Sequence, residues 1–225
     1  MKHSDGGMNQ HGSIKSREMN DLKEFLSRVF RPFFWALAVF FPSIVTEETW
    51  NREYRRGDWD LLDSDEQLAH NAIVVGHLMN ASERSRILEV GCGSGSLLQL
   101  LQRVGFESYL GIDISSEAVS RAAALNVPNS FFQVADARRF VADERFDFIV
   151  FNEVAYYFER PVDVLQRYSE FLKDEGVIII SMFDFMLSRI IWKKLDRVFI
   201  TLDLNTVHNR KGHKWQIRVI AKKGK

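Results

Sequence analysis

The chain has 225 residues, 46% hydrophobic and 12% aromatic, which is enough for one well-buried domain with additional elements. Thirty Lys and Arg residues balance 30 Asp and Glu residues, so the composition gives no electrostatic footprint for DNA or RNA, and we expect no nucleic-acid partner. A single cysteine excludes an internal disulfide, and no His or Cys spacing suits a metal. We therefore expect a cytoplasmic protein without a metal site.

The N-terminal part divides into a tail and a cap. Residues 1–20 are polar and predict a flexible tail, and residues 21–85 are expected to form cap or lid helices. Within the cap, the apolar run Phe33–Phe41 is far shorter than the ~20 residues that span a bilayer. Three uses for segment 25–45 remain open, namely a lid, a homodimer contact, or a peripheral membrane contact with basic residues upstream.

The cap continues with an aromatic segment and a helix. Trp50 and Tyr54 are four residues apart, so on a helix they share a face. That face either covers a ligand or packs in the core. A helix is predicted over Glu66–Met79, and we interpret its His70 and His77 as polar contacts rather than ligands.

The stretch Arg86–Val104 predicts a buried strand, a glycine loop and a helix. Gly91, Gly93 and Gly95 permit a tight turn and close approach of the backbone to a ligand. A dinucleotide fingerprint would place its third glycine where Ser96 stands. Glu89, just before the loop, suits a ligand with an ammonium group better than a pyrophosphate.

The next strands each end in a polar residue. The second, Ser108–Ile112, leads to Asp113, which lies 22 residues after Gly91 and suits ribose hydroxyls. The third, Ser130–Val134, leads to Asp136, which taken alone is a turn residue or a helix cap.

The fourth strand, Phe146–Phe151, is followed by Asn152 and Glu153. Because ligands bind at the carboxyl ends of the strands of an open α/β sheet, we expect these polar residues to face one site.

The C-terminal part predicts a helix at Pro161–Leu172, a strand at Val177–Met182, a helix at Phe185–Leu195 and a final hairpin. If Asn209–Gly212 is a four-residue loop, the register of the hairpin follows. The pairs are then Leu202 with Val219, Leu204 with Ile217, and Thr206 with Trp215.

Three stretches resemble motifs of the class I S-adenosylmethionine-dependent methyltransferases. Residues 89–95, Glu-Val-Gly-Cys-Gly-Ser-Gly, resemble motif I, and residues 111–115, Gly-Ile-Asp-Ile-Ser, resemble the second motif. Residues 152–157, Asn-Glu-Val-Ala-Tyr-Tyr, are similar to the stretch in small-molecule and sugar methyltransferases, including the rhizobial nodulation N-methyltransferases.

The resemblance implies a Rossmann-like seven-stranded α/β sheet over 86–225, parallel with a C-terminal antiparallel hairpin and helices on both faces. It also implies S-adenosylmethionine as cofactor and S-adenosylhomocysteine as product. The loop would hold the methionine part, Asp113 the ribose, Asp136 and Ala137 the adenine, and the Asn152 carbonyl the ammonium group. The implied cofactor-binding residues are Tyr54, Glu89, Gly91, Cys92, Gly93, Gly95, Asp113, Ile114, Asp136, Ala137 and Asn152.

The methyl acceptor is less defined. Base- and glutamine-modifying members of the family that this chain resembles carry Asn-Pro-Pro-Tyr at this point. No Pro-Pro follows Asn152 here, so the resemblance argues against a nucleobase and implies a hydroxyl or amine of a small polar molecule or a sugar. A lipid-linked acceptor stays open because of segment 25–45. Glu153, Tyr157 and His208 are the candidate bases, in that order, although His208 also fits a loop-end hydrogen bonder and a neutral amine needs no base. The alternatives are a nicotinamide-dependent oxidoreductase, which Ser96 and Glu89 oppose, and a non-catalytic S-adenosylmethionine-binding module.

Overall fold

The computed structural model describes residues 46–60, 65–79, 85–210 and 212–223. The expected tail 1–20 and segment 25–45 lie outside the described residues, so the three uses of that segment stay predictions. Among the described helices, none combines the length and the apolar character needed to cross a bilayer.

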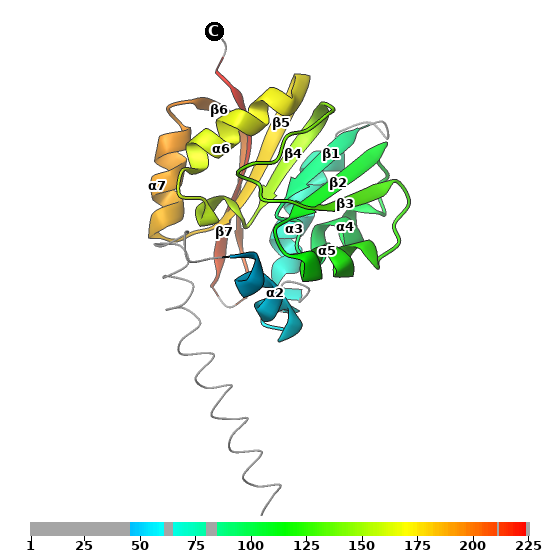
Figure 1. The fold of residues 1–225 in the computed structure, drawn as a ribbon. Coiled ribbons are helices and arrows are strands. Elements are labelled where there is room, and N and C mark those ends of the chain that lie inside the picture. Colours follow the sequence, from blue (N-terminus) through cyan, green and yellow to red (C-terminus); the bar gives the residue numbers. More distant parts are fainter. Residues whose placement is uncertain (1–45, 61–64, 80–84, 211, 224–225) are drawn as a thin grey trace, which may run out of the picture. The chain divides into compact units, whose positions relative to one another are not determined.

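Seven strands form one sheet in the order β3-β2-β1-β4-β5-β7-β6 (Figure 1). Strands β1 to β5 pair in parallel, whereas β7 is antiparallel to both β5 and β6. The strands are β1 (Arg86–Val90), β2 (Ser108–Asp113), β3 (Ser130–Val134), β4 (Phe146–Asn152), β5 (Leu172–Phe183), β6 (Phe199–His208) and β7 (Lys214–Lys222). This confirms the predicted parallel sheet with a C-terminal antiparallel hairpin.

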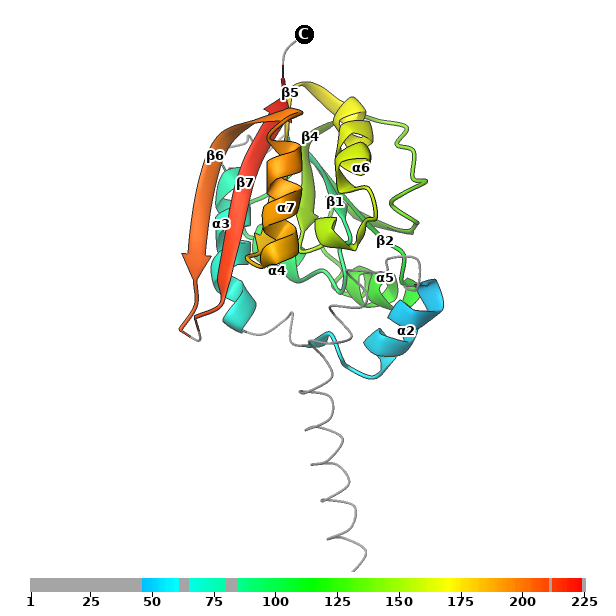
Figure 2. The same cartoon turned by 90° about the vertical axis from the view of Figure 1, so that its left-hand side faces the viewer.

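Helices cover both faces of the sheet. Helices α3 and α4 lie on one face, and α6 and α7 lie on the other (Figure 2). Helix α2 packs against α5. The helices are α2 (Glu47–Arg55), α3 (Asp65–Met79), α4 (Ser96–Leu101), α5 (Ser116–Ala123), α6 (Pro161–Tyr168) and α7 (Met186–Leu195), with 3₁₀ turns η3 (Ala155–Tyr157) and η4 (Ser169–Phe171).

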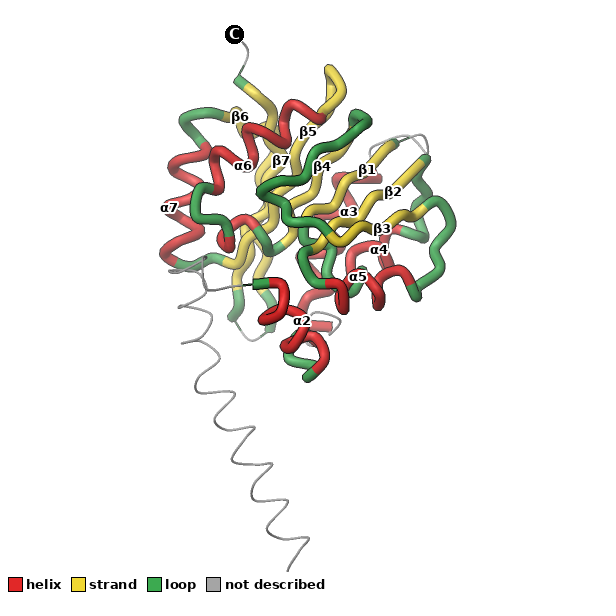
Figure 3. The backbone as a smooth tube through the Cα atoms, viewed as in Figure 1, coloured by secondary structure: helices red, strands yellow, loops and turns green. Residues whose placement is uncertain are grey.

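The centre of the sheet positions the site. Strand β1 pairs with β2 on one side and β4 on the other, so the chain reverses its direction of travel across the sheet at β1. Strands β1 and β4 are buried, as expected when helices cover both faces of the sheet. Leu88 of β1 and Ile149 of β4 are fully inaccessible to solvent. A reversal of this kind leaves a crevice at the carboxyl ends of the strands, and the loops after β1, β2 and β4 gather there (Figure 3).

The predicted hairpin register is wrong by one residue. Asp203 pairs with Val219, Asn205 with Ile217 and Val207 with Trp215, after a bulge between Thr201 and Asp203. His208 pairs with Lys214, and the Asn209 N–H donates to the His213 carbonyl at 3.0 Å, so the loop is one residue longer than expected. A one-residue slip turns every side chain of a strand to its other face. Leu202 and Leu204 are consequently about half exposed, at 54% and 49%.

Candidate functional site

The glycine loop after β1 turns in a conformation that favours glycine. Gly91, Gly93 and Gly95 have φ angles of 73°, 54° and 86°. A Cβ at Gly93 would lie 2.9 Å from the Tyr54 hydroxyl oxygen, and one at Gly91 would lie 2.7 Å from a methyl group of Val154. The loop therefore lacks side chains at the two points where α2 and the end of β4 approach it.

Asp113 at the end of β2 holds this loop in place. Its carboxylate accepts hydrogen bonds from the backbone N–H of Gly93 at 3.0 Å and of Ser115 at 2.8 Å. Burial raises the pKa of Asp113, and the backbone N–H donors oppose that rise. A carboxylate has about four lone-pair positions, so Asp113 can still accept hydrogen bonds from a ligand.

Helix α2 is fixed beside the loop. The Asn51 side-chain oxygen accepts from the Ser115 hydroxyl at 2.7 Å and from the Glu117 N–H at 3.1 Å. Arg121 of α5 donates to the Tyr54 carbonyl at 2.6 Å. These contacts place the Tyr54 ring, which is 5% exposed, against the loop.

An aromatic cluster connects α2 to the turn after β4. The Trp50 ring lies 5.0 Å from that of Trp59 and contacts that of Tyr157 edge-on at 5.1 Å. Glu53 accepts from the Trp59 indole N–H at 3.0 Å. The predicted shared face of Trp50 and Tyr54 therefore contacts the turn after β4 through Trp50 and the glycine loop through Tyr54.

Glu89 lies beneath the glycine loop. It is 2% exposed and accepts a hydrogen bond from the Tyr109 hydroxyl of β2. Burial raises the pKa of Glu89 to about 8; the hydrogen bond from Tyr109 opposes the rise and the charge of Asp113 adds to it. Nearby, Cys92 is 3% exposed, and burial raises the pKa of its thiol, which therefore fills space under the loop as a neutral group.

The end of β4 presents two partly buried polar side chains, Asn152 and Glu153. The Asn152 side-chain N–H donates to the Asn71 oxygen of α3 at 2.8 Å, while Asn152 Oδ1 is buried with no partner among the described residues. Glu153 has a φ of 58°, a strained backbone conformation for this residue type. A buried acceptor without a donor, beside the glycine loop, is available to a ligand.

The Glu153 carboxylate is enclosed by donors. It accepts from the Tyr156 hydroxyl at 3.0 Å, the Ser181 hydroxyl at 3.1 Å and the Phe183 N–H at 3.2 Å, and Trp215 adds a further hydrogen bond. Burial nevertheless raises the pKa of Glu153 to about 7. A carboxyl group poised near neutral pH can hold or release a proton under ordinary conditions.

The comparisons with known proteins agree with this geometry. Residues 63–224 match the family described as methyltransferase domain. The chain belongs to this family. It is 30% identical over 100 residues to trans-aconitate 2-methyltransferase of Rhizobium rhizogenes, covering 44% of this chain and 39% of that protein. It is 32% identical over 137 residues to ribosomal protein L11 methyltransferase of Thermosipho melanesiensis, covering 60% and 48%.

Among solved structures, the chain resembles the N-methyltransferase NodS of Bradyrhizobium japonicum WM9 in complex with S-adenosyl-L-homocysteine. The TM-score is 0.64 at 17% identity, covering 74% of this chain and 92% of that chain. This likeness supports the fold. The matches span 39% to 48% of the first curated relatives, so this chain corresponds to less than half of their length.

The residues present fit the cofactor of this methyltransferase family, S-adenosylmethionine. The loop has open backbone where a Cβ at Gly93 would meet Tyr54, Asp113 keeps acceptor capacity, and Asn152 Oδ1 has no partner among the described residues. The structure brings one part of the predicted cofactor site together at the ends of β1, β2 and β4. This part consists of Tyr54, the loop residues 91–95, Asp113, Ile114 and Asn152.

The residues expected to contact adenine, Asp136 and Ala137, already form hydrogen bonds with other side chains of the protein. Asp136 accepts from the Arg138 N–H at 2.9 Å and from its guanidinium at 2.8 Å. Burial raises the pKa of Asp136, but these Arg138 contacts outweigh it and hold the pKa below its ordinary value. The Ala137 carbonyl accepts from the Tyr168 hydroxyl at 3.0 Å and from Arg167. An adenine amine would therefore share the Asp136 carboxylate with Arg138, and the assignment stays a prediction.

The three candidate bases have different positions in the methyltransferase domain. Glu153 and Tyr157 lie together after β4, but burial raises the pKa of Tyr157 well above its ordinary value, so that its hydroxyl stays protonated. His208 is exposed at the end of β6, where it has no described contact with either of them. In the described part of the chain, no three or more His, Cys, Asp or Glu residues group as metal ligands.

Sequence reasoning missed the residues that support Glu153 and Asn152 from neighbouring elements. These are Asn71 of α3, Ser181 of β5 and Trp215 of β7. Ser181 interrupts an apolar strand and is fully buried, which is a signal the sequence did offer. His70 was interpreted correctly as a polar contact, since its ring nitrogens lie 3.2 Å from the Ser181 hydroxyl and 2.7 Å from Gln67 Oε1.

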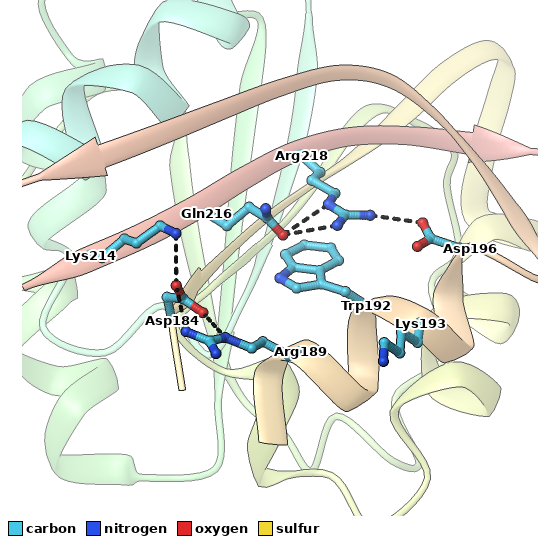
Figure 4. Close-up of a pocket in the computed structure, with 8 residues that line it drawn as sticks. All are labelled: Asp184, Arg189, Trp192, Lys193, Asp196, Lys214, Gln216 and Arg218. Atoms are coloured by element: carbon cyan, nitrogen blue, oxygen red, sulfur yellow. Dashed lines mark hydrogen bonds and ion pairs between the residues drawn. The ribbon is translucent and has the colours of Figure 1, made fainter. Parts of the chain in front are cut away.

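A hollow away from the glycine loop lies between α7 and β7, with a volume of about 320 Å³ (Figure 4). Its carboxylates are paired, because Asp184 contacts Arg189 at 2.7 Å and Lys214 at 2.9 Å, and Asp196 contacts Arg218 at 2.7 Å. The hydrogen bond from Arg189 lowers the pKa of Asp184 to about 2. Its acids are neutralised from within, which distinguishes this hollow from the edge of the sheet at the glycine loop.

Proposed function

We propose that this methyltransferase transfers the methyl group of S-adenosylmethionine to a hydroxyl or amine of a small polar molecule or a sugar unit. The observation that carries the proposal is Glu153, a buried carboxyl group with a pKa of about 7 at the end of β4, next to the loop that fits the cofactor. The aromatic cluster of Trp50, Trp59 and Tyr157 supports a small acceptor, because it packs α2 against the turn that follows Glu153.

The mechanism needs little covalent chemistry from the protein. Bound S-adenosylmethionine would supply an electrophilic methyl group on a positively charged sulfur, with S-adenosylhomocysteine as the leaving group. The glycine loop, Asp113 and Asn152 would orient the cofactor, and α2 would exclude water. A carboxylate oxygen of Glu153 would accept the proton that a hydroxyl acceptor loses, whereas a neutral amine needs no such base.

The test is release of S-adenosylhomocysteine with a panel of sugars, small hydroxy compounds and amines. Turnover with one of these classes is expected, and Glu153→Gln should remove the dependence of kcat on a group with a pKa near 7 for a hydroxyl acceptor. Turnover only with a protein or a nucleic acid would overturn the acceptor class. Cofactor binding without turnover on any acceptor would favour the non-catalytic module, and binding of NADH in its place would favour the oxidoreductase.

A peripheral membrane contact through segment 25–45 remains part of this proposal because of its apolar run Phe33–Phe41. A lipid-linked acceptor would then be reached at the membrane surface. Sedimentation with liposomes should carry down the full-length chain but not a version that lacks residues 1–45. Equal partitioning of the two proteins would remove the membrane contact, and a dimer by light scattering that dissociates on the same truncation would assign the segment to a homodimer.

A further inference from the structure

A buried line of hydrogen-bonding groups runs from Glu153 to α3. Ser181 Oγ lies 3.1 Å from Glu153 Oε1 and 3.2 Å from His70 Nδ1. On the other side of the ring, His70 Nε2 lies 2.7 Å from Gln67 Oε1. Ser181 is fully buried and His70 is 1% exposed, while Glu153 and Gln67 at the two ends are partly buried, so the buried middle of the line connects the site to the surface beside α3.

The supply of hydrogens in this line is limited. A serine hydroxyl has one hydrogen, so Ser181 cannot donate to Glu153 and His70 at the same time. His70 carries one ring hydrogen, because burial lowers its pKa to about 4 and keeps the ring neutral. The three contacts can therefore be satisfied together in only two ways.

In the first arrangement, Gln67 Oε1 accepts from His70 Nε2–H, Ser181 donates to His70 Nδ1, and Glu153 must be the neutral acid that donates to Ser181. In the second, the amide of Gln67 is turned and donates to Nε2, His70 Nδ1–H donates to Ser181, and Ser181 donates to Glu153 Oε1, which accepts whether Glu153 is ionised or protonated on Oε2. Ionisation of Glu153 therefore excludes the first arrangement and leaves only the second. An amide oxygen and nitrogen occupy the same space, so only the terminal amide has to turn.

The surroundings hold the ring in place for both arrangements. His70 stacks on the Trp215 ring at 4.9 Å with the planes 9° apart, and Trp215 also hydrogen-bonds Glu153. The other titratable groups facing Glu153 are Tyr156 and Tyr157 of η3, and burial raises the pKa of both hydroxyls well above the ordinary value. Within the described residues, no Lys or Arg forms an ion pair with Glu153. His70 is thus the one ring in this line whose single hydrogen can occupy either of two nitrogens.

We propose that His70 is a positioning residue whose ring tautomer is coupled, through Ser181, to the protonation state of Glu153. Ionisation of the acid then moves three hydrogens. The Glu153 hydrogen passes to Ser181, the Ser181 hydrogen passes to His70 Nδ1, and the hydrogen of Nε2 passes to water beside Gln67. One proton leaves in total, and the ring stays neutral. This inference rests on the proposed function only for its purpose. In that role, the line would keep Glu153 hydrogen-bonded both before and after it accepts a proton as a catalytic base.

The decisive measurement is ¹⁵N NMR of the full-length protein with labelled histidine, from pH 5.5 to 8.5, without cofactor or acceptor. The Nε2–H tautomer of the His70 ring should be populated at low pH and should disappear in favour of Nδ1–H with a midpoint near pH 7, where Glu153 titrates. Glu153→Gln and Ser181→Ala should each make the tautomer independent of pH. A single tautomer throughout in the wild-type protein, or a ring that becomes charged in this range, would overturn the proposal.

His77→Gln is the matched control. His77 lies seven residues along the same helix and contacts Asn205 Oδ1 at 2.6 Å, away from Glu153. The His70 switch should persist unchanged in this variant. Because the NMR titration requires no turnover, failure of the acceptor proposal would leave it standing, and a failed titration with normal turnover would remove only the coupling. If the Ser181 variant does not fold, the wild-type titration still decides.

Discussion

Two regions of this protein treat carboxyl groups in opposite ways. Toward the carboxyl ends of β1, β2 and β4, Glu89 is buried and Asp113 and Glu153 are partly buried. All three have raised pKa values and no Lys or Arg ion-pair partner among the described residues. In the hollow between α7 and β7, Asp184 has two cationic partners and a pKa near 2.

This difference separates a binding edge from a structural one. Without a nearby cation, burial favours the neutral form of these carboxyl groups, and a positively charged ligand would favour their ionised form. A sulfonium compound with an ammonium group is such a ligand. In the hollow over Trp192, the carboxylates already form ion pairs with neighbouring Arg and Lys side chains (Figure 4). Among the described residues, carboxyl groups without a cationic partner next to open backbone mark the candidate site, whereas paired carboxylates line this hollow.

The largest expected effect is on cofactor binding through the glycine loop. Gly93→Arg should abolish binding of S-adenosylhomocysteine by calorimetry, a loss on the order of 100-fold or more, since a side chain there meets Tyr54 in a left-handed backbone. Gly105→Arg is the matched control, because Gly105 also has a positive φ but no atom within 4 Å of its Cβ position. Equal losses in the two variants would point to backbone strain rather than to the site.

Exchange of one carboxylate in each region should give the next largest contrast. Asp113→Ala should weaken S-adenosylhomocysteine binding about 10- to 100-fold, because charge-assisted hydrogen bonds to the ligand and to Gly93 are lost. Asp184→Asn should leave the affinity unchanged. The two regions would lose their distinction if Asp184→Asn weakened binding as much as Asp113→Ala.

The raised pKa of Glu89 predicts a specific dependence of stability on pH. Between pH 7 and 8, Glu89 is mostly protonated in the folded chain but ionised in the unfolded chain, whose reference value is 4.5. Stability should therefore fall as the pH rises through this window, by about 1 kcal/mol. Glu153, with a pKa of about 7, adds a smaller fall in the same window, so the contribution of Glu89 is the difference between the wild type and Glu89→Gln. His70 titrates below pH 6.5 and does not interfere there. Urea unfolding of Glu89→Gln should show a flatter profile from pH 7 to 8, and a profile as steep as that of the wild type would contradict the buried neutral acid.

The smallest effect is expected from the paired acid. Asp184→Asn should cost less than about 1 kcal/mol in urea unfolding at pH 7, because Arg189 and Lys214 are 67% and 40% exposed and solvent screens their attraction. The lowered pKa of Asp184 implies that its contribution is present above pH 3.8 and disappears as the pH falls toward 2. A cost of 3 kcal/mol would show that the pairs in this hollow are stronger than their exposure allows.

Local patterns were sufficient for most of the fold. The glycine spacing and apolar runs predicted β1, β2, β3 and β4 with ends that agree within a residue, because each depends on its own residues. The hairpin register failed, because it depends on the bulge near Leu202 and on a loop one residue longer than expected. The alternation of Leu202 and Leu204 gave no sign of that choice.

The candidate site shows the same division between local and distant information. Gly93, Asp113 and Glu153 were identified from spacing and from the resemblance, and the structure places Gly93 and Asp113 in direct contact. The partners of Glu153 come from β5, β7 and η3, and His70 joins it from α3 through Ser181.

The sequence by itself determined the strand–glycine loop–helix unit, the acids that end the strands and the membership of this chain in a methyltransferase family, since all of these are written in neighbouring residues. Only the tertiary structure decided which acids are neutralised and which are not. Burial and the distance to a cation set the charge of a carboxyl group, and both depend on elements that lie far apart along the chain.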